Sequence, residues 1–160
     1  MRRMIQIMQF LSFKDLCIGI CLVILLASSG FGIVDGTSMH PSLKNNHMFI
    51  YSKVTKQTEP KVGDIVLIDS PDSDTYLVKR LIGVPSTRVY LNKGMVIGAD
   101  DFLLTDVYLT ESQLLADTEV VVVPPNQVYY IGDNQENSID SRHTGTVPMS
   151  SIIGIVKVKF

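Results

Sequence analysis

Hydrophobic and polar positions divide the chain into two parts with different periodicity. From Leu16 to Val34, nineteen residues follow one another without a charge. At the helical rise of about 1.5 Å per residue, a segment of this length reaches roughly 28 Å, close to the hydrocarbon thickness of a bilayer. The pattern predicts one apolar helix over 16–34 that crosses a membrane.

A removable secretory signal is the alternative for this segment. A charged start, an apolar stretch and the small residues Ala27-Ser28-Ser29 also form the pattern of a cleavage site. The apolar run continues beyond that site through Phe31 to Val34. We therefore favour a retained anchor over a cleaved signal.

After Asp35 the pattern is typical of an all-β domain. Short runs rich in β-branched and aromatic residues alternate with turn residues, and only Glu111–Ala116 has a short helical pattern. Because no helix of crossover length separates the runs, we expect two antiparallel β-sheets. The stretch 92–126 has the fewest motifs and is predicted to be a smaller insertion or cap. The strands are predicted at His47–Val54, Ile65–Ile68, Thr75–Ile82, Arg88–Leu91, Met95–Ile97, Phe102–Tyr108, Thr118–Val123, Val128–Ile131 and Ile152–Lys159.

Charge is distributed unevenly between the two parts. Residues 1–34 hold three basic residues against one acidic residue, whereas the remainder has a net charge of −4. Since basic residues next to a membrane segment tend to stay in the cytoplasm, 1–15 is predicted to be a cytoplasmic arm, 16–34 the anchor and 35–160 a folded extracytoplasmic domain. The mildly acidic outer domain offers no footprint for nucleic acid.

Cysteine and histidine give no sign of a disulfide or a metal site. Cys17 and Cys21 are the only cysteines, and their i, i+4 spacing on one helix is poor geometry for a disulfide. His40, His47 and His143 show no metal-ligand spacing. We expect no metal and no cofactor, and a domain stabilised by its packed core.

Lys79 lies in a strand-like run of hydrophobic residues. Alternation along a strand places Leu77, Lys79 and Leu81 on one face and Arg80 on the other. Burial disfavours an ammonium group, and a neutral lysine can accept a proton from a serine hydroxyl. The alternative is a lysine whose stem packs on the leucines while its amine reaches water, and this strand alone favours that alternative.

Ser38 stands in the short polar sequence Gly36-Thr37-Ser38-Met39-His40-Pro41, just after the apolar segment. A tight turn there exposes the hydroxyl and leaves backbone N–H groups free to bind an oxyanion. An ordinary loop serine is one alternative, and a Ser/His/Asp arrangement with His143 near Asp140 is another. No Gly-x-Ser-x-Gly motif surrounds Ser38, and His40 is too close in sequence to serve well as a base, so we rank the lysine mechanism above the histidine one.

Four motifs in order resemble those of the type I signal peptidase family. The chain is also short, which resembles the compact Gram-positive members with one anchor. The resemblance implies the two-sheet Ser–Lys protease fold that self-cleaving repressors share, preceded by one N-terminal transmembrane helix. The motifs are Ser38–Leu43, Gly63–Val66, Lys79–Gly83 and Gly132–Arg142, the last followed by Gly145 and Val147.

The resemblance also implies roles by matching position. Ser38 would be the nucleophile and Lys79 the general base. Asp133 would belong to a turn that also braces the site. The supporting residues would be Ser138, which orients the lysine amine, and an ion-pair cluster of Asp140, Arg142 and Arg80.

Two departures from the family pattern affect the details. Gly36 stands where some members have a serine that donates to the oxyanion, so the oxyanion hole would use the backbone N–H of Ser38, helped by that of Gly36. The lysine motif usually continues as Gly-x-Pro-Gly-Asp, whereas this chain has Gly83-Val84-Pro85-Ser86-Thr87, which alters a turn beyond the lysine.

The implied activity is a membrane-anchored serine endopeptidase that removes signal peptides from secreted preproteins after small residues. We expect a monomer in the cell membrane, with preproteins and lipid as partners and an extended substrate pairing with strands. The predicted substrate contacts are Ile33, Val34, Asp35, Gly36, Met39, Tyr76 and Val78.

Two other functions are weaker alternatives. A self-cleaving repressor would need a DNA-binding domain, which this chain lacks beside its anchor. A non-catalytic assembly factor for pilus or surface proteins would be marked by loss of the serine or the lysine, and both Ser38 and Lys79 are present.

Overall fold

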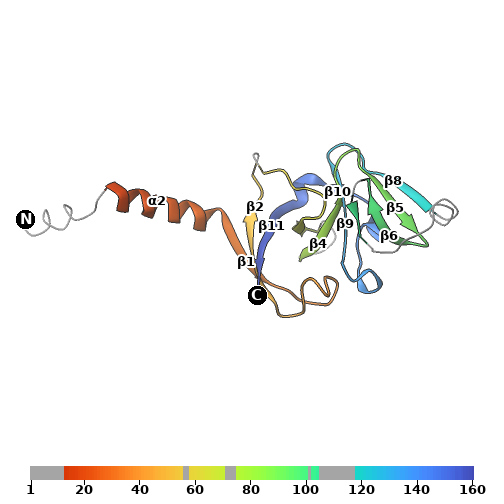
Figure 1. Cartoon of the computed structure of the whole chain (residues 1–160), viewed down its shortest axis with the longest axis horizontal. Coiled ribbons are helices and arrows are strands. Elements are labelled where there is room, and N and C mark those ends of the chain that lie inside the picture. The colour runs from red at the N-terminus through yellow and green to blue at the C-terminus, as the bar shows by residue number, and fades with distance from the viewer. Residues whose placement is uncertain (1–12, 56–57, 71–74, 101, 105–117) are drawn as a thin grey trace, which may run out of the picture.

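The structure is a computed structural model that describes residues 13–55, 58–70, 75–100, 102–104 and 118–160. Figure 1 shows a helix that projects from one end of a β-rich body. The helices are α2 (Phe13–Ala27), α4 (Ser141–Thr144) and the 3-10 turns η1 (Gln135–Asn137) and η2 (Met149–Ser151). The strands are β1 (Ser29–Ile33), β2 (Met48–Lys53), β3 (Ile65–Asp69), β4 (Tyr76–Gly83), β5 (Arg88–Asn92), β6 (Met95–Ala99), β7 (Phe102–Leu103), β8 (Thr118–Val122), β9 (Gln127–Ile131), β10 (Val147–Pro148) and β11 (Ile152–Lys159).

The described strands form two antiparallel sheets, which confirms the predicted fold class. The large sheet has the order β1-β2-β11-β3-β4-β9-β10, and the small sheet has the order β7-β6-β5-β8. Strands β1, β2 and β11 lie nearest the helix, and the small sheet lies at the far end of the body (Figure 1).

Most predicted strands are confirmed to within two residues at each end. The run from Phe102 to Tyr108 is confirmed only at β7, because 105–108 lie outside the described residues, as does the predicted short helix Glu111–Ala116. Strand β10 was not predicted, because its two residues are too few to show an alternating pattern. The small sheet begins at Arg88, earlier than the predicted insertion over 92–126, because β5 belongs to it.

The structure differs from the prediction of one helix over 16–34. Helix α2 ends at Ala27, and β1 follows after one residue and pairs with β2 from Ser29↔Ser52 to Ile33↔Met48. A Cβ at Gly30 or Gly32 would overlap an aromatic ring of β2, so these two glycines let β1 lie close against the sheet. An apolar run does not by itself distinguish a helix from a strand, which explains the error. Within the described residues there is no helix of the length and hydrophobicity needed to cross a membrane.

The two faces of the large sheet carry separate hydrophobic clusters. One cluster includes Leu81, Val66 and Tyr130, and a second contains Met39 and Leu43, which are 1% and 0% exposed. The second cluster therefore fixes the turn that carries Ser38 to the large sheet. A third cluster joins the small sheet to the large one and consists of Ile82, Val89, Leu91, Val96, Ala99, Val123, Tyr129 and Ile131.

The two cysteines lie on α2, where both are exposed. Cys17 and Cys21 are free in the structure.

Candidate active site

Ser38 lies in a turn between β1 and β2. The turn is closed by hydrogen bonds from the His40 amide to the Thr37 carbonyl (3.0 Å) and from the Leu43 amide to the Met39 carbonyl (2.8 Å). Ser38 itself is half-buried. Among the described residues, neither its hydroxyl nor its amide has a hydrogen-bond partner, so both are available to a substrate.

Lys79 is buried in β4, where it pairs with Val66 of β3. Lys79 is 4% exposed, and its amine donates a hydrogen bond of 2.9 Å to Ser138 Oγ. Burial lowers the pKa of Lys79 from 10.5; the negative charge of Asp140 opposes this shift and the positive charge of Arg142 adds to it. The amine is thus bound inside the protein, which disfavours the alternative of a lysine that reaches water.

Gly132 is the point where the Ser38 turn and the Lys79–Ser138 pair meet. A Cβ at Gly132 would overlap Ser138 Oγ and would lie 2.5 Å from the Ser38 carbonyl oxygen. The same carbonyl accepts a hydrogen bond of 2.9 Å from the Asn134 amide. Only glycine fits at this position. In this structure the Lys79 amine is hydrogen-bonded to Ser138 and not to Ser38.

Asp140 is a buried carboxylate held by hydrogen bonds from Arg142 and Gly132. It is 0% exposed and accepts from Arg142 Nε (2.8 Å), Arg142 Nη2 (3.0 Å) and the Gly132 amide (3.0 Å). Burial by itself raises the pKa of this carboxyl, but the hydrogen bonds from Arg142, Gly132 and Ser138 outweigh burial and hold its pKa below 3.8. Asp140 therefore stays charged and fixes the segment that carries Ser138.

Known proteins that are similar to the chain show its family. Residues 7–160 match the model of the family described as signal peptidase, peptidase S26. The chain belongs to the S26 signal peptidases. It is an enzyme of the signal peptidase I type, a hydrolase of the serine peptidase class.

Curated signal peptidases of Bacillus are similar over most of the chain. Signal peptidase I P of Bacillus subtilis subsp. natto is 32% identical over 161 aligned residues, which cover 92% of this chain and 86% of that protein. Signal peptidase I of Bacillus licheniformis is 31% identical over 160, with the same coverage. The crystal structure of a signal peptidase I from Enterococcus faecalis V583 has a TM-score of 0.48 at 22% identity and covers 62% of this chain and 98% of that one.

Arg80 of this signal peptidase does not join Asp140, which corrects the predicted cluster. Its Nε and Nη2 each donate to a carboxylate oxygen of Asp133 at 2.6 Å, and it also binds the Gly63 carbonyl and Ser42 Oγ. The side chain of Arg80 leaves β4 on the face opposite to Lys79, and Asp133 meets it there. The support consists of two separate ion pairs, Arg80–Asp133 and Arg142–Asp140.

The Gly36 amide was predicted to help the oxyanion hole of the signal peptidase. It donates instead to Asn45 Oδ1 at 2.9 Å, a contact that the sequence analysis missed. This hydrogen bond leaves the Ser38 amide as the candidate oxyanion donor.

The predicted substrate contacts fall into exposed and buried groups. Ile33 and Tyr76 are 63% and 64% exposed, and Asp35 and Gly36 are also exposed. Strands β2, β11 and β3 separate β1 from β4 in the large sheet. An extended peptide therefore cannot pair with β1 and β4 together, and only the segment that follows β1 can reach it on the side opposite to β4. Three side chains, those of Val34, Met39 and Val78, pack into the cluster beneath the Ser38 turn.

His143 is placed poorly for the histidine mechanism. Its Nδ1 lies 3.9 Å from Asp140 Oδ1, beyond hydrogen-bond distance, and its side chain is 57% exposed. The Asp140 carboxylate is already bound by Arg142. The geometry therefore favours Lys79 over His143 as the base of this signal peptidase.

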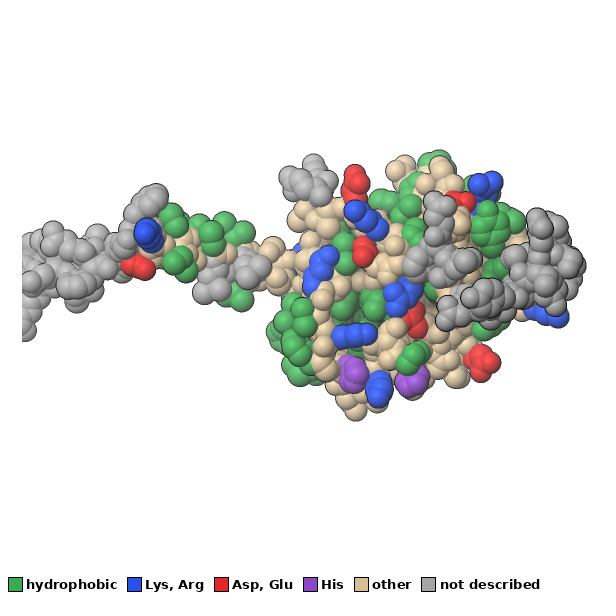
Figure 2. Space-filling view, viewed as in Figure 1, with side chains coloured by type: hydrophobic (Ala, Val, Ile, Leu, Met, Phe, Trp, Pro, Cys, Tyr) green, Lys and Arg blue, Asp and Glu red, His purple; other side chains and the backbone are tan. Residues whose placement is uncertain are grey.

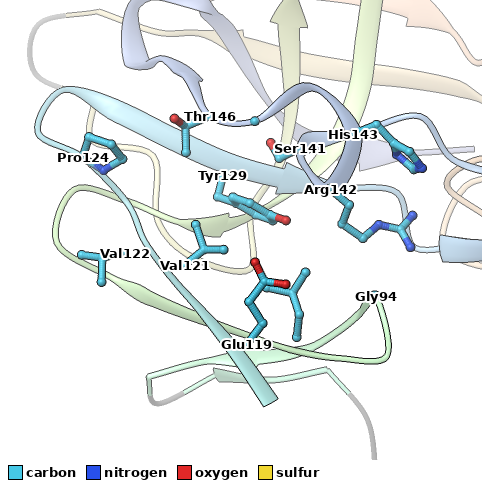
Figure 3. Close-up of a pocket in the computed structure, with 12 residues that line it drawn as sticks. Gly94, Glu119, Val121, Val122, Pro124, Tyr129, Ser141, Arg142, His143 and Thr146 are labelled. Atoms are coloured by element: carbon cyan, nitrogen blue, oxygen red, sulfur yellow. The ribbon is translucent and has the colours of Figure 1, made fainter. Parts of the chain in front are cut away.

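A cavity of about 510 Å³ lies beside the Arg142 pair, between the small sheet, β9 and α4. Figure 3 shows the Tyr129 ring above Glu119, with Arg142 and His143 of α4 at one side of the cavity. Burial raises the pKa of Tyr129 to about 12, so its hydroxyl stays neutral. The described residues that line this cavity include neither Ser38 nor Lys79, so it is separate from the candidate active site.

Proposed function

We propose that the chain is a membrane-anchored signal peptidase in which Ser38 is the nucleophile and Lys79 the general base. Its substrates are secreted preproteins, which it cleaves after small residues. The observation that carries the proposal is the buried Lys79 amine, bonded to Ser138 at 2.9 Å beside the Ser38 turn.

The proposed reaction uses the neutral amine of Lys79. This amine takes the proton of the Ser38 hydroxyl as the oxygen attacks the scissile carbonyl, and the Ser38 amide binds the resulting oxyanion. The peptide C–N bond then breaks, the leaving amine takes the proton from Lys79, and Ser38 is left as an acyl ester. Water, deprotonated by the same amine, attacks the ester and restores the free serine.

Ser138 and Asp140 support this reaction without touching the scissile bond. Ser138 Oγ accepts a hydrogen bond from the Lys79 amine, which leaves the lone pair of that amine free to face Ser38. Hydrogen bonds between catalytic groups often form fully only once substrate is bound, and we expect the Ser38–Lys79 contact to form in this way.

Helix α2 supports the proposed membrane anchor. Its exposed apolar side chains cover all sides of the helix, with Leu16, Ile18, Val23 and Leu26 each more than half exposed. A helix that is apolar all round is stable only where an apolar medium surrounds it. We propose that α2 lies in the bilayer as part of the predicted anchor, with the N-terminal end of the chain on the cytoplasmic side and the β domain outside.

The surface next to α2 adds to this support. Figure 2 shows hydrophobic side chains gathered on the edge of the body nearest the helix. The exposed large hydrophobic residues of β1, β2 and the C-terminal end of the chain are Phe31, Ile33, Met48, Ile50, Val158 and Phe160. In our proposal this edge faces the lipid surface. Cleavage after Ser29, as in a removable signal, would instead cut into β1, and the N-terminal sequence of the mature protein distinguishes the two possibilities.

The test is cleavage of a secreted preprotein by the full chain in detergent, compared with Ser38→Ala and Lys79→Arg. Ser38→Ala lacks the nucleophile, and Lys79→Arg keeps the positive charge but does not deprotonate. Both variants should therefore fold, and neither should cleave. His143→Ala is the matched control and should cleave like the wild type. Turnover by Lys79→Arg, or loss of turnover in a folded His143→Ala, would move the role of base to the histidine.

A further inference from the structure

The start of β6 contacts the active-site loop, by which we mean residues 132–142. Gln135 Oε1 accepts from the Val96 amide and Gln135 Nε2 donates to the Val96 carbonyl, both at 2.8 Å. The N–H and C=O of one strand residue point to the same side, so the side-chain amide of Gln135 pairs with Val96 as a neighbouring strand would. Among the described residues, β7 pairs with β6 only at Gly98 and Ala99. The backbone of Val96 therefore has no strand partner on that side and is bonded by Gln135 instead.

Gln135 lies between the residues that hold the two proposed catalytic side chains. One residue earlier, the Asn134 amide binds the Ser38 carbonyl at 2.9 Å. Three residues later, Ser138 Oγ binds the Lys79 amine at 2.9 Å. A shift of Gln135 would therefore move both Ser38 and Lys79 relative to a substrate.

A second contact fastens the other end of the loop to β6. Arg142 is buried, with its side chain 8% exposed, and its Nη2 donates to the Gln135 carbonyl. The same guanidinium pairs with Asp140 and donates from Nη1 to Met95 Sδ at 3.6 Å. Met95 and Val96 are neighbours in β6, so one rigid strand supports the loop at two points. Val96 is itself 0% exposed and packs in the cluster that joins the two sheets.

We propose that Gln135 is a positioning residue, which ties the active-site loop to β6 so that Ser138 presents the Lys79 amine to Ser38. This inference rests on the proposed function, because it assigns Gln135 a role in the reaction of that site. The small sheet then acts as the support of the catalytic loop. Since reaction rates fall steeply when reacting groups are misplaced by an ångström, two hydrogen bonds at Val96 are enough to affect turnover.

The test compares Gln135→Met and Gln135→Glu with the wild type, as full chains in detergent. Methionine has a similar length and loses both hydrogen bonds, whereas glutamate keeps an acceptor for the Val96 amide and loses the donor. The matched control is Gln127→Met. In the wild type, the Gln127 side chain accepts a hydrogen bond from Thr146 at the end of β9 that lies away from the loop. Among the described residues, no side-chain hydrogen bond joins Gln127 to the loop residues named above.

Turnover and its pH dependence are the first readouts. We expect kcat of Gln135→Met to fall by about ten- to a hundred-fold, with a smaller fall for Gln135→Glu and an unchanged KM. A loosened loop also admits water to Lys79, so the acid limb of the rate profile should move to higher pH, while Asp140 and Arg142 still face the amine. Gln127→Met should match the wild type in all three quantities.

Hydrogen–deuterium exchange supplies a readout that does not need activity. Peptides from 132–142 should exchange faster in Gln135→Met and at the wild-type rate in Gln127→Met. Wild-type kcat and pH profile in Gln135→Met, or unchanged exchange in the loop, would overturn the inference. A wild-type chain that cleaves no preprotein would refute the proposed function instead, and the exchange rates would still report whether Gln135 holds the loop.

Discussion

Lys79 shows how burial among strand neighbours lowers the pKa of one side chain. Leu77 and Leu81 on the same face of β4 pack into a hydrophobic cluster, and Lys79 is buried between them. The charged form is therefore disfavoured, and the pKa of the amine lies below 10.5. This burial has a cost to stability that depends on pH.

The pH dependence of stability at Lys79 can be predicted with its sign. Between the lowered pKa of the folded state and about 10.5, the unfolded chain binds more protons than the folded chain, so the free energy of unfolding rises with pH. Lys79→Met removes this contribution. Urea unfolding at several pH values should show the wild type gaining stability relative to Lys79→Met as pH rises, and a constant difference would contradict the burial of the amine.

Residue-level prediction from sequence succeeded where local alternation decides the outcome and failed where distant segments meet. Alternation along β4 placed Lys79 and Arg80 on opposite faces, and the structure agrees. The partner of Arg80 depends on how the 132–142 loop is folded, so Asp133 was not identified as that partner. Gln135 was likewise missed, because its contact with Val96 joins the loop after β9 to the small sheet and leaves no pattern in the sequence.

At the level of elements, one departure from the family motif lies in the turn between β4 and β5. Ser86 stands where the motif usually has glycine, and its φ is +71°, in the left-handed region. The turn is held by the Thr87 amide bonding to the Val84 carbonyl (3.0 Å) and the Ser86 amide bonding to the Val123 carbonyl (2.9 Å). The chain therefore keeps the backbone shape that glycine favours, with a residue for which that shape is strained.

Ser86→Gly should consequently stabilise the protein. Relief of the left-handed strain should raise the free energy of unfolding by about 1 kcal/mol, after part of the gain is offset by the greater freedom of glycine in the unfolded chain. Ser86→Ala is the control, because it keeps a Cβ and should stay within about 0.5 kcal/mol of the wild type. Thermal and urea unfolding measure both, and a glycine variant no more stable than the alanine variant would show that the turn is unstrained.

For the whole molecule, β1 sets where the folded domain begins. Chain alternation predicted the order of the strands after Asp35, but β1 was hidden inside the apolar run, because Ser-Gly-Phe-Gly-Ile has no polar alternation. Its pairing with β2 protects that strand, which would otherwise be the edge of the large sheet. Unprotected edges of this kind promote association with other chains.

Two truncated chains test this boundary. In a mild detergent, a chain that begins at Ser28 retains β1, whereas one that begins at Asp35 loses it and exposes the edge of β2. We expect the shorter chain to have a lower Tm and to self-associate, measured by calorimetry and sedimentation. Equal Tm values and equal mass in solution would show that β1 adds nothing to the domain.

The place of β11 also determines when the site can come into existence. This strand follows every other described strand of the large sheet in chain order, yet it lies between β2 and β3. The Ser38 turn leads into β2 and Lys79 lies in β4, so the two residues belong to strands on opposite sides of β11. A nascent chain that has not yet produced β11 holds the serine and the lysine without the sheet that aligns them. In the order of synthesis, the large sheet is thus completed only after both Ser38 and Lys79 have been made.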